Sequence, residues 1–180
     1  MTFAPKPLLA GDKPTLYREL AAQVAGLLAG ERDPWANAAN AAALLFASLR
    51  DLNWTGFYFL RGGELVVGPF QGRPACVRIA PGRGVCGAAA AARRTLVVPD
   101  VHAFADHIPC DSASNSELVT PILHDGRLVG VLDLDSPYLG RFDDQDAAGL
   151  AHGLNNQHTR HDGRIGEMPL KKRLVNRYIF

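Results

Sequence analysis

Three cysteines are the residues in this sequence best suited to covalent chemistry: Cys76, Cys86 and Cys110. Cys110 lies in the stretch 99–117, PDVHAFADHIPCDSASNSE, which shows neither helical nor strand periodicity. Structureless loops longer than about 12–15 residues are uncommon in a compact domain unless they bind or catalyse. The polar run after Cys110 is suited to lining a ligand cavity, so this loop is the first candidate site. The alternative is a surface loop that carries a spare thiol.

The cysteines allow three interpretations. A zinc site is disfavoured because there is no CxxC pair and because His102 and His107 lack the spacing of structural zinc ligands, so we expect no metal. An inert core thiol suits Cys76, which falls on an expected strand. Cys86 opens a glycine-flanked helix whose dipole can favour a thiolate, and Cys110 lies in the polar loop. Two thiols on separate segments are what a nucleophile and a resolving thiol require.

Acidic residues form the second candidate group. Asp133 and Asp135, in VLDLDS, are two apart on an expected strand and therefore point to one face, and Glu117 ends the long loop. Carboxylates on one face repel unless a cation or a shared proton relieves them. The pattern predicts a pocket for an ammonium group, with a protonated acid able to give a proton to a leaving oxygen. The alternative is a strand end that enters solvent.

Two helices are expected before any of these residues. Apolar residues from Leu16 to Leu28 recur at helical spacing and predict a helix over 12–30. Asp33 as N-cap, followed by Pro34, predicts a second helix that runs to Leu49. Neither helix carries residues suited to chemistry, so both are expected to support the site from outside.

From residue 53 the periodicity changes to two, which predicts strands. Trp54 and Tyr58 lie on an aromatic strand over 53–59; such residues are more often core, although an aromatic wall would suit a thioether or methyl group. Asp125-Gly126 is a strong hairpin signal. Further strands are expected at 64–67, 75–79, 95–98, 118–123 and 127–135, with helices at 88–93 and 142–154. This order predicts an α+β fold: an antiparallel sheet with helices packed on one side and a long active-site loop.

Composition limits the remaining possibilities. The chain has 180 residues, 47% of them hydrophobic, and a formal net charge of +1, which fits one domain and gives no basic footprint for nucleic acid. There is no secretory leader pattern and no apolar run of about 18 residues, so we expect no membrane partner and a cytoplasmic protein. An odd number of cysteines disfavours a secreted disulfide framework.

The segments FQGRPACVRI, GRGVCG, DVHAFADHIPCDSASNSELVTPI and DGRLVGVLDLDSP closely resemble the free methionine-(R)-sulfoxide reductases, a family built on a GAF domain. The resemblance covers about residues 15–154 and includes all three cysteines. It implies a GAF-like fold, a homodimer, and thiol-dependent reduction of free L-methionine (R)-sulfoxide without a cofactor, with thioredoxin as the reductant. Most GAF domains are binding modules, so a ligand-binding or redox-sensing module is the alternative.

The resemblance also implies a role for individual residues. Cys110 looks like the nucleophile that becomes a sulfenic acid, and Cys86 looks like the resolving thiol that forms a disulfide with it. Cys76 resembles a third family cysteine that can join an alternative disulfide. The three carboxylates that look like ligands of the amino acid are Glu117, Asp133 and Asp135, and of these Glu117 and Asp135 look like the catalytic acids. Trp54 and Tyr58 resemble the aromatic lining near the substrate's methyl group.

The chain after Leu154 departs from the family's usual ending. We expect one GAF domain over 1–156 and a C-terminal tail of uncertain order over 157–180. The tail's basic residues are compatible with a nucleic-acid arm, but its mixed charges and terminal position favour a solvated or partly ordered appendix.

Overall fold

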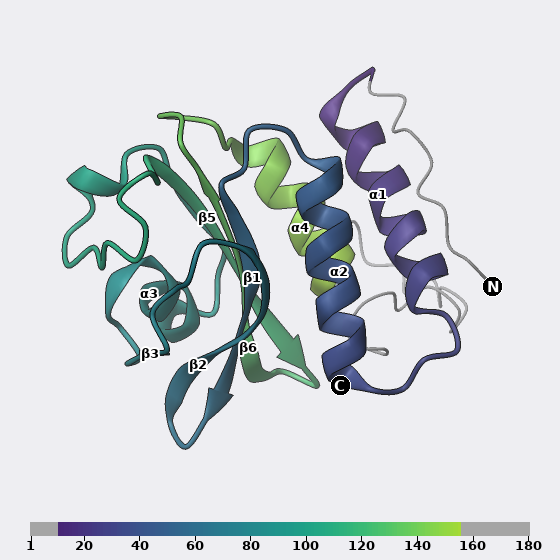
Figure 1. Cartoon of the computed structure of the whole chain (residues 1–180), viewed down its shortest axis with the longest axis horizontal. Coiled ribbons are helices and arrows are strands. Elements are labelled where there is room, and N and C mark those ends of the chain that lie inside the picture. The colour runs from purple at the N-terminus through teal and green to yellow at the C-terminus, as the bar shows by residue number, and fades with distance from the viewer. Residues whose placement is uncertain (1–10, 156–180) are drawn as a thin grey trace, which may run out of the picture.

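A computed structural model of the chain describes residues 11–155 (Figure 1). The elements are α1 (Lys13–Leu28), α2 (Pro34–Ser48), β1 (Trp54–Arg61), β2 (Glu64–Gly72), β3 (Arg78–Ile79), α3 (Gly84–Ala92), β4 (Leu96–Val98), a 3₁₀ turn (Val101–Ala103), β5 (Ser116–His124), β6 (Arg127–Ser136) and α4 (Asp144–Asn155). The six strands form one antiparallel sheet in the order β3-β2-β1-β6-β5-β4. The expected α+β class is confirmed. The expected tail at 157–180 lies outside the described residues.

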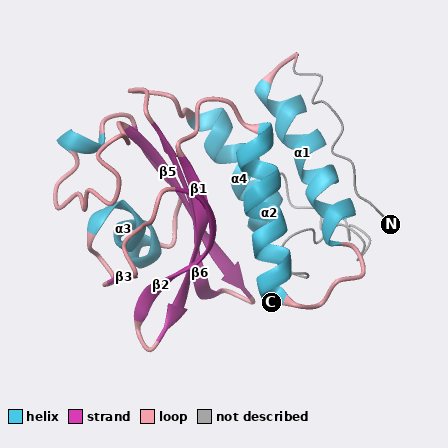
Figure 2. Ribbon diagram, viewed as in Figure 1, coloured by secondary structure: helices cyan, strands magenta, loops and turns pink. Residues whose placement is uncertain are grey.

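The helices cover both faces of the sheet, which corrects the expectation that all pack on one side. Figures 1 and 2 show α1, α2 and α4 beside one face and α3 beside the other. Two separate apolar clusters match this arrangement. One joins α1, α2 and α4 to Phe57, Leu118 and Leu132, and the other joins α3 to Tyr58 and Val119. Neighbouring strand residues point to opposite faces, so β1, β5 and β6 each supply both clusters.

The helices on the first face begin where the sequence predicted. Asp12 accepts a hydrogen bond from the Thr15 amide at 2.7 Å, and Asp33 accepts one from the Ala36 amide at 2.8 Å. Such caps satisfy amides that have no partner within the helix. In the described part of the chain, none of the helices has the length and apolar content needed to cross a membrane.

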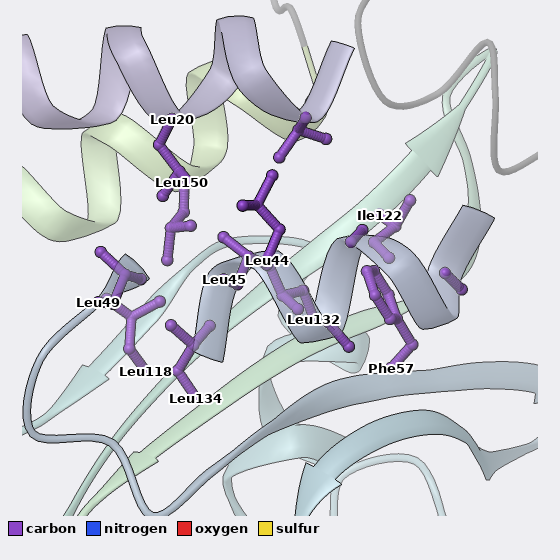
Figure 3. Close-up of a cluster of buried hydrophobic side chains, with 14 of the residues drawn as sticks. Leu20, Leu44, Leu45, Leu49, Phe57, Leu118, Ile122, Leu132, Leu134 and Leu150 are labelled. Atoms are coloured by element: carbon purple, nitrogen blue, oxygen red, sulfur yellow. The ribbon is translucent and has the colours of Figure 1, made fainter. Parts of the chain in front are cut away.

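The core beneath these helices fixes the inner strands. Figure 3 shows leucines of α1, α2 and α4 meeting leucine and phenylalanine side chains of the sheet. Leu118, Leu132 and Leu134 are fully buried there. Because β5 and β6 are held rigidly from this side, their other face can present polar side chains at fixed positions. That other face carries the candidate site.

Three elements around the site differ from the expected ones. β3 comprises two residues rather than 75–79, which leaves Cys76 in the connection before the strand. β2 extends to Gly72, and its register with β1 shifts between Gly56 and Tyr58. α3 begins at Gly84 instead of Ala88, so its first turn contains Cys86. The first two changes shape the cavity wall, and the third places a thiol inside it.

Candidate active site

A cavity of about 40 Å³ lies on the sheet face that α3 covers, closed at one end by the long loop. Its lining contains seven of the eight residues that the sequence singled out: Trp54, Tyr58, Cys86, Cys110, Glu117, Asp133 and Asp135. The eighth, Cys76, is bonded to one of them. Residues far apart in the sequence are therefore brought to one place, as predicted.

The strand register brings the carboxyl groups together. Glu117 of β5 lies opposite Asp135 of β6, and Trp54 of β1 lies opposite Asp135 on the other side. Asp133 is two residues before Asp135 and shares its face, as the alternation predicted. The alternative of a strand end entering solvent is wrong, since Glu117 and Asp133 are each only 6% exposed.

Burial changes the acidity of all three carboxyl groups. Loss of solvation raises the pKa of Asp133 to about 7. Burial, and then the charges of the two aspartates, raises the pKa of Glu117 well above its ordinary value. Burial, and then the charge of Asp133, does the same to the pKa of Asp135. At neutral pH the group therefore holds protons that isolated carboxylates would have lost.

Asp133 also has an unused acceptor. Its Oδ1 is buried and has no hydrogen-bond partner in the described structure. Among the described residues that line the cavity there is no lysine or arginine. An unpaired buried carboxylate oxygen is costly unless a ligand or cation satisfies it. The site is therefore built to receive a positively charged or hydrogen-bond-donating group.

Cys86 is a buried free thiol in this acidic group. Its Sγ donates to Oε1 of Glu117 at 3.9 Å. Burial, and then the charges of Asp133 and Glu117, raises the pKa of the thiol well above its ordinary value. The expectation that the helix dipole favours a thiolate here is wrong, because desolvation and the neighbouring carboxylates outweigh the dipole.

The disulfide joins Cys76 and Cys110, whose Cα atoms are 5.5 Å apart. We expected Cys110 to pair with Cys86 and Cys76 to be an inert core thiol or an alternative partner, so this pairing is a correction. The physical reason is position. Cys86 is fixed inside the first turn of α3 and faces carboxyl groups, whereas Cys76 lies in a connection that passes beside the long loop.

An aromatic wall completes the cavity. The rings of Trp54 and Tyr58 stack with centroids 5.8 Å apart, and Phe70 stacks on the other side of Trp54 at 5.3 Å. The indole Nε1 donates to the carbonyl of Arg73 at 3.1 Å, which fixes the ring. A side chain at Gly56 would overlap both Phe70 and the Trp54 ring, so the wall needs glycine at that position.

Residues 12–154 match the GAF domain family. Over 139 residues the chain is 50% identical to the free methionine-R-sulfoxide reductase of Escherichia coli, covering 77% of this chain and 84% of that protein. The chain belongs to the free methionine-R-sulfoxide reductase family of GAF domains. It is also 38% identical over 143 residues to the free methionine-R-sulfoxide reductase of Saccharomyces cerevisiae, covering 75% of this chain and 79% of that one.

A solved structure agrees with this membership. The free methionine-R-sulfoxide reductase of Neisseria meningitidis, in complex with its substrate, superimposes with a TM-score of 0.77 at 49% identity, covering 81% of this chain and 87% of that one. The resemblance drawn from the cysteine-bearing segments is thereby confirmed, as is the GAF fold.

In this GAF domain the polar run after Cys110 has two functions. Ser114 and Asp111 line the cavity, and Asn53 Nδ2 donates to both side chains, at 3.0 and 3.2 Å. Asn115 instead anchors the loop: its Nδ2 donates to the carbonyl of Pro137 at 2.7 Å, and its backbone amide to Ser136 at 2.8 Å. The expectation that the whole run lines a cavity holds for only part of it.

Sequence reasoning missed several lining residues of this GAF domain. His107 contributes a ring whose Nδ1 is buried and has no hydrogen-bond partner in the described structure. Burial, and then the charge of His102, lowers its pKa, so the ring is neutral at pH 7. Gly84 has φ at +59°, and a side chain at this position would press against Ile108 at the cavity's edge. His107 could have been found from the sequence, because it lies in the long loop that we identified as a candidate site. Nothing in the sequence indicated that Gly84 packs near Ile108.

Three side chains in this GAF domain are of types that bind metal ions and lie close enough together to share one. Ligand atoms of Cys86, Glu117 and Asp133 all lie within 4.8 Å of one another, and all three side chains are buried. The three cysteines do not form a metal site together, because Cys76 and Cys110 are bonded to each other and only the Cys86 thiol is left to bind a metal.

Proposed function

We propose that this chain is a thiol-dependent reductase of free L-methionine (R)-sulfoxide. The observation that carries the proposal is the placement of Cys110, in a disulfide, on the same cavity as three carboxyl groups, of which Glu117 and Asp133 are buried and Asp135 is partly buried. A redox-active thiol beside protonated acids is what reduction of a sulfoxide requires, because an unprotonated sulfoxide oxygen is a poor leaving group. The reductase names of the family relatives support the same conclusion.

The carboxyl group cluster would bind the amino acid through its ammonium group. Asp133 Oδ1 is buried and available as an acceptor. Burial raises its pKa to about 7, so the Asp133 carboxyl group can ionise near neutral pH and carry the negative charge. Trp54 and Tyr58 would contact the sulfur-bound methyl group. Because the ammonium must be free, methionine sulfoxide within a peptide chain would be excluded.

The first chemical step would be attack by the Cys110 thiolate on the sulfoxide sulfur. The S–O bond breaks, the oxygen ends on Cys110 as a sulfenic acid, and methionine leaves with its sulfur reduced. Burial raises the pKa of Glu117 and of Asp135, which favours their protonated forms and suits them to protonate the departing oxygen. The sulfur of Cys110 is oxidised by the two electrons that the substrate gains.

The second step would form the disulfide seen in the structure. The Cys76 thiol attacks the sulfenic sulfur of Cys110, a water molecule leaves, and the S–S bond forms. Cys76 thus takes the resolving role that we expected for Cys86. A dithiol reductant, expected to be thioredoxin, then restores both thiols, so electrons come from thiols and the cycle needs no cofactor. A homodimer is a further expectation from the family resemblance.

Multiple-turnover assays with the separated R and S epimers test this proposal. With dithiothreitol as reductant, we expect methionine from the R epimer of the free amino acid and none from its N-acetylated form, which lacks the ammonium group. Cys110→Ser should lose all turnover, whereas Ser112→Ala, an exposed change in the same loop, should retain it. Methionine formation that stops at one equivalent per chain would instead indicate a redox sensor and overturn the proposal.

A further inference from the structure

We infer that Cys86, Glu117 and Asp133 form a binding site for a thiophilic divalent cation such as Zn²⁺, and that the cation excludes the amino acid from the cavity. The three ligand atoms come from three different elements, α3, β5 and β6, and lie within 4.8 Å of one another. The binding site rests on this geometry and on a buried oxygen of Asp133 that has no hydrogen-bond partner in the described structure. The exclusion of the amino acid rests on the proposed function.

The distances are close to those of a coordinated ion. Zinc takes sulfur at about 2.3 Å and carboxylate oxygen at about 2.0–2.2 Å, so two such ligands of a tetrahedral ion lie about 3.5 Å apart. Cys86 Sγ and Glu117 Oε1 are already 3.9 Å apart. The widest pair, within 4.8 Å, needs a side-chain movement of about 1 Å to reach that tetrahedral spacing.

A second observation points to a cation independently of the spacing. Asp133 is 6% exposed, and its Oδ1 lacks a hydrogen-bond partner although it is buried. Among the described lining residues there is no lysine or arginine to satisfy this oxygen. A divalent ion would satisfy it and would also remove the repulsion between Asp133 and Glu117.

The kind of donor atom selects the kind of metal. A thiolate with two carboxylates suits zinc or cadmium, whereas calcium and magnesium prefer ligand sets made of oxygen alone. The fourth position would face the cavity, whose volume of about 40 Å³ exceeds the roughly 10–15 Å³ that one water needs. Binding would displace the Cys86 thiol proton and the carboxyl protons into solvent, so affinity should rise with pH.

The disulfide form offers a clean test. All three cysteines are in the described part of the chain, and with Cys76 and Cys110 bonded, Cys86 is the remaining free thiol. Co²⁺ is the probe, because a thiolate ligand gives it a near-ultraviolet charge-transfer band that histidine and carboxylate ligands do not. Titration of the oxidised full-length chain without reductant should saturate at one equivalent, and Zn²⁺ should abolish the band.

Three variants sharpen the result. Cys86→Ser should lose the charge-transfer band, and Asp133→Asn should weaken Co²⁺ binding by about tenfold or more, as loss of even an outer-shell partner can. Asp125→Asn, which removes a carboxylate that is 86% exposed, should change nothing. Absence of the band in folded oxidised protein, or its persistence in Cys86→Ser, overturns the site.

A separate binding measurement tests the exclusion. In the double variant Cys76→Ser, Cys110→Ser, the one thiol is Cys86 and no reaction can occur. Saturating Zn²⁺ should raise the Kd for free methionine sulfoxide at least tenfold, as measured by calorimetry. An unchanged Kd with bound zinc overturns the exclusion, while failure of the sulfoxide to bind even without zinc counts against the proposed function instead. The cobalt band is independent of both results.

Discussion

Glu117 on β5 lies directly opposite Asp135 on β6, so two carboxyl groups from different strands are fixed side by side on the buried face of a sheet. Asp133 adds a third two residues earlier, and Cys86 approaches from α3. Like charges at this separation cannot all persist in a buried site. The protonation state of this group is therefore the property from which the site's pH dependence follows.

Ligand binding should depend on pH through Asp133. Its pKa is raised to about 7 by burial, and an ammonium ion binds well only when the carboxyl group is ionised. In the unreactive Cys110→Ser variant, affinity for free methionine sulfoxide should rise by about tenfold per pH unit below pH 7 and then level off. Calorimetry between pH 5 and 8 measures this directly.

The control for that prediction is Asp133→Asn, in which the dependence near pH 7 should disappear and binding should be weak throughout. An unaltered pH profile in this variant would assign the titration to another group. Glu117→Gln provides the comparison, because it removes a neighbouring carboxyl group whose pKa is also raised by burial.

Folding stability should respond to the same carboxyl group with a defined sign. Because the folded pKa of Asp133 is above its unfolded value of 3.8, its stabilising contribution is present below pH 3.8 and is lost as pH rises through about 7. The free energy of unfolding of Asp133→Asn should therefore increase relative to the wild type between pH 4 and 8. Urea denaturation at several pH values measures the difference, and a difference that falls with pH would contradict the raised pKa.

The disulfide pairing predicts different outcomes for the two candidate resolving cysteines. Cys76→Ala should release one methionine per chain and then fail to be recycled by thioredoxin, because the sulfenic acid on Cys110 has no partner. Cys86→Ala should still form the Cys76–Cys110 disulfide. Peptide mapping of the oxidised variants, with thioredoxin-dependent turnover measured in parallel, separates the two. A Cys86–Cys110 peptide as the main product would restore the pairing that we expected from the resemblance.

The sequence predicted those parts of the site that depend on local pattern. Alternation placed Asp133 and Asp135 on one face, and the capping residues Asp12 and Asp33 marked the helix starts. Local pattern could not predict the disulfide partner, since Cys76 and Cys110 are 34 residues apart and are brought together by the tertiary fold. Pairings of cysteines follow from three-dimensional distance, which spacing in the sequence does not encode.

Other errors had similar causes. From its helix position we expected Cys86 to favour a thiolate. The carboxyl groups that disfavour the thiolate come from strands distant in the sequence, so the local pattern did not reveal them. α3 was placed on the wrong face of the sheet, since a short alanine-rich helix is apolar all round and gives no preferred side. Asn115 belongs to the polar run that we expected to line a cavity, yet its partners Ser136 and Pro137 lie at the end of β6 and just after it.

Substrate binding should require the reduced state. In the disulfide form Cys110, which lines the cavity of about 40 Å³, is bonded to Cys76. The Cys76–Cys110 bond ties the long loop to the connection before β3, so breaking it allows the cavity to widen. Oxidised protein should bind the sulfoxide at least tenfold more weakly than Cys110→Ser, as measured by calorimetry, and equal affinity would contradict this.

The anchoring of the long loop by Asn115 should be as important as its cysteine. The side chain donates to the Pro137 carbonyl at 2.7 Å and its Oδ1 is 2.9 Å from His102 Nε2. Asn115→Ala should cost about 1–2 kcal/mol, since the partly buried Pro137 carbonyl loses its partner. It should also speed proteolysis within the loop and lower kcat/KM, because Cys110 would no longer be held at the cavity.

Asn40→Ala, an exposed change within α2, is the matched control and should alter none of these. A loop that resists proteolysis equally in both variants would show that Ser116, which donates to the Tyr138 carbonyl, is a sufficient anchor on its own.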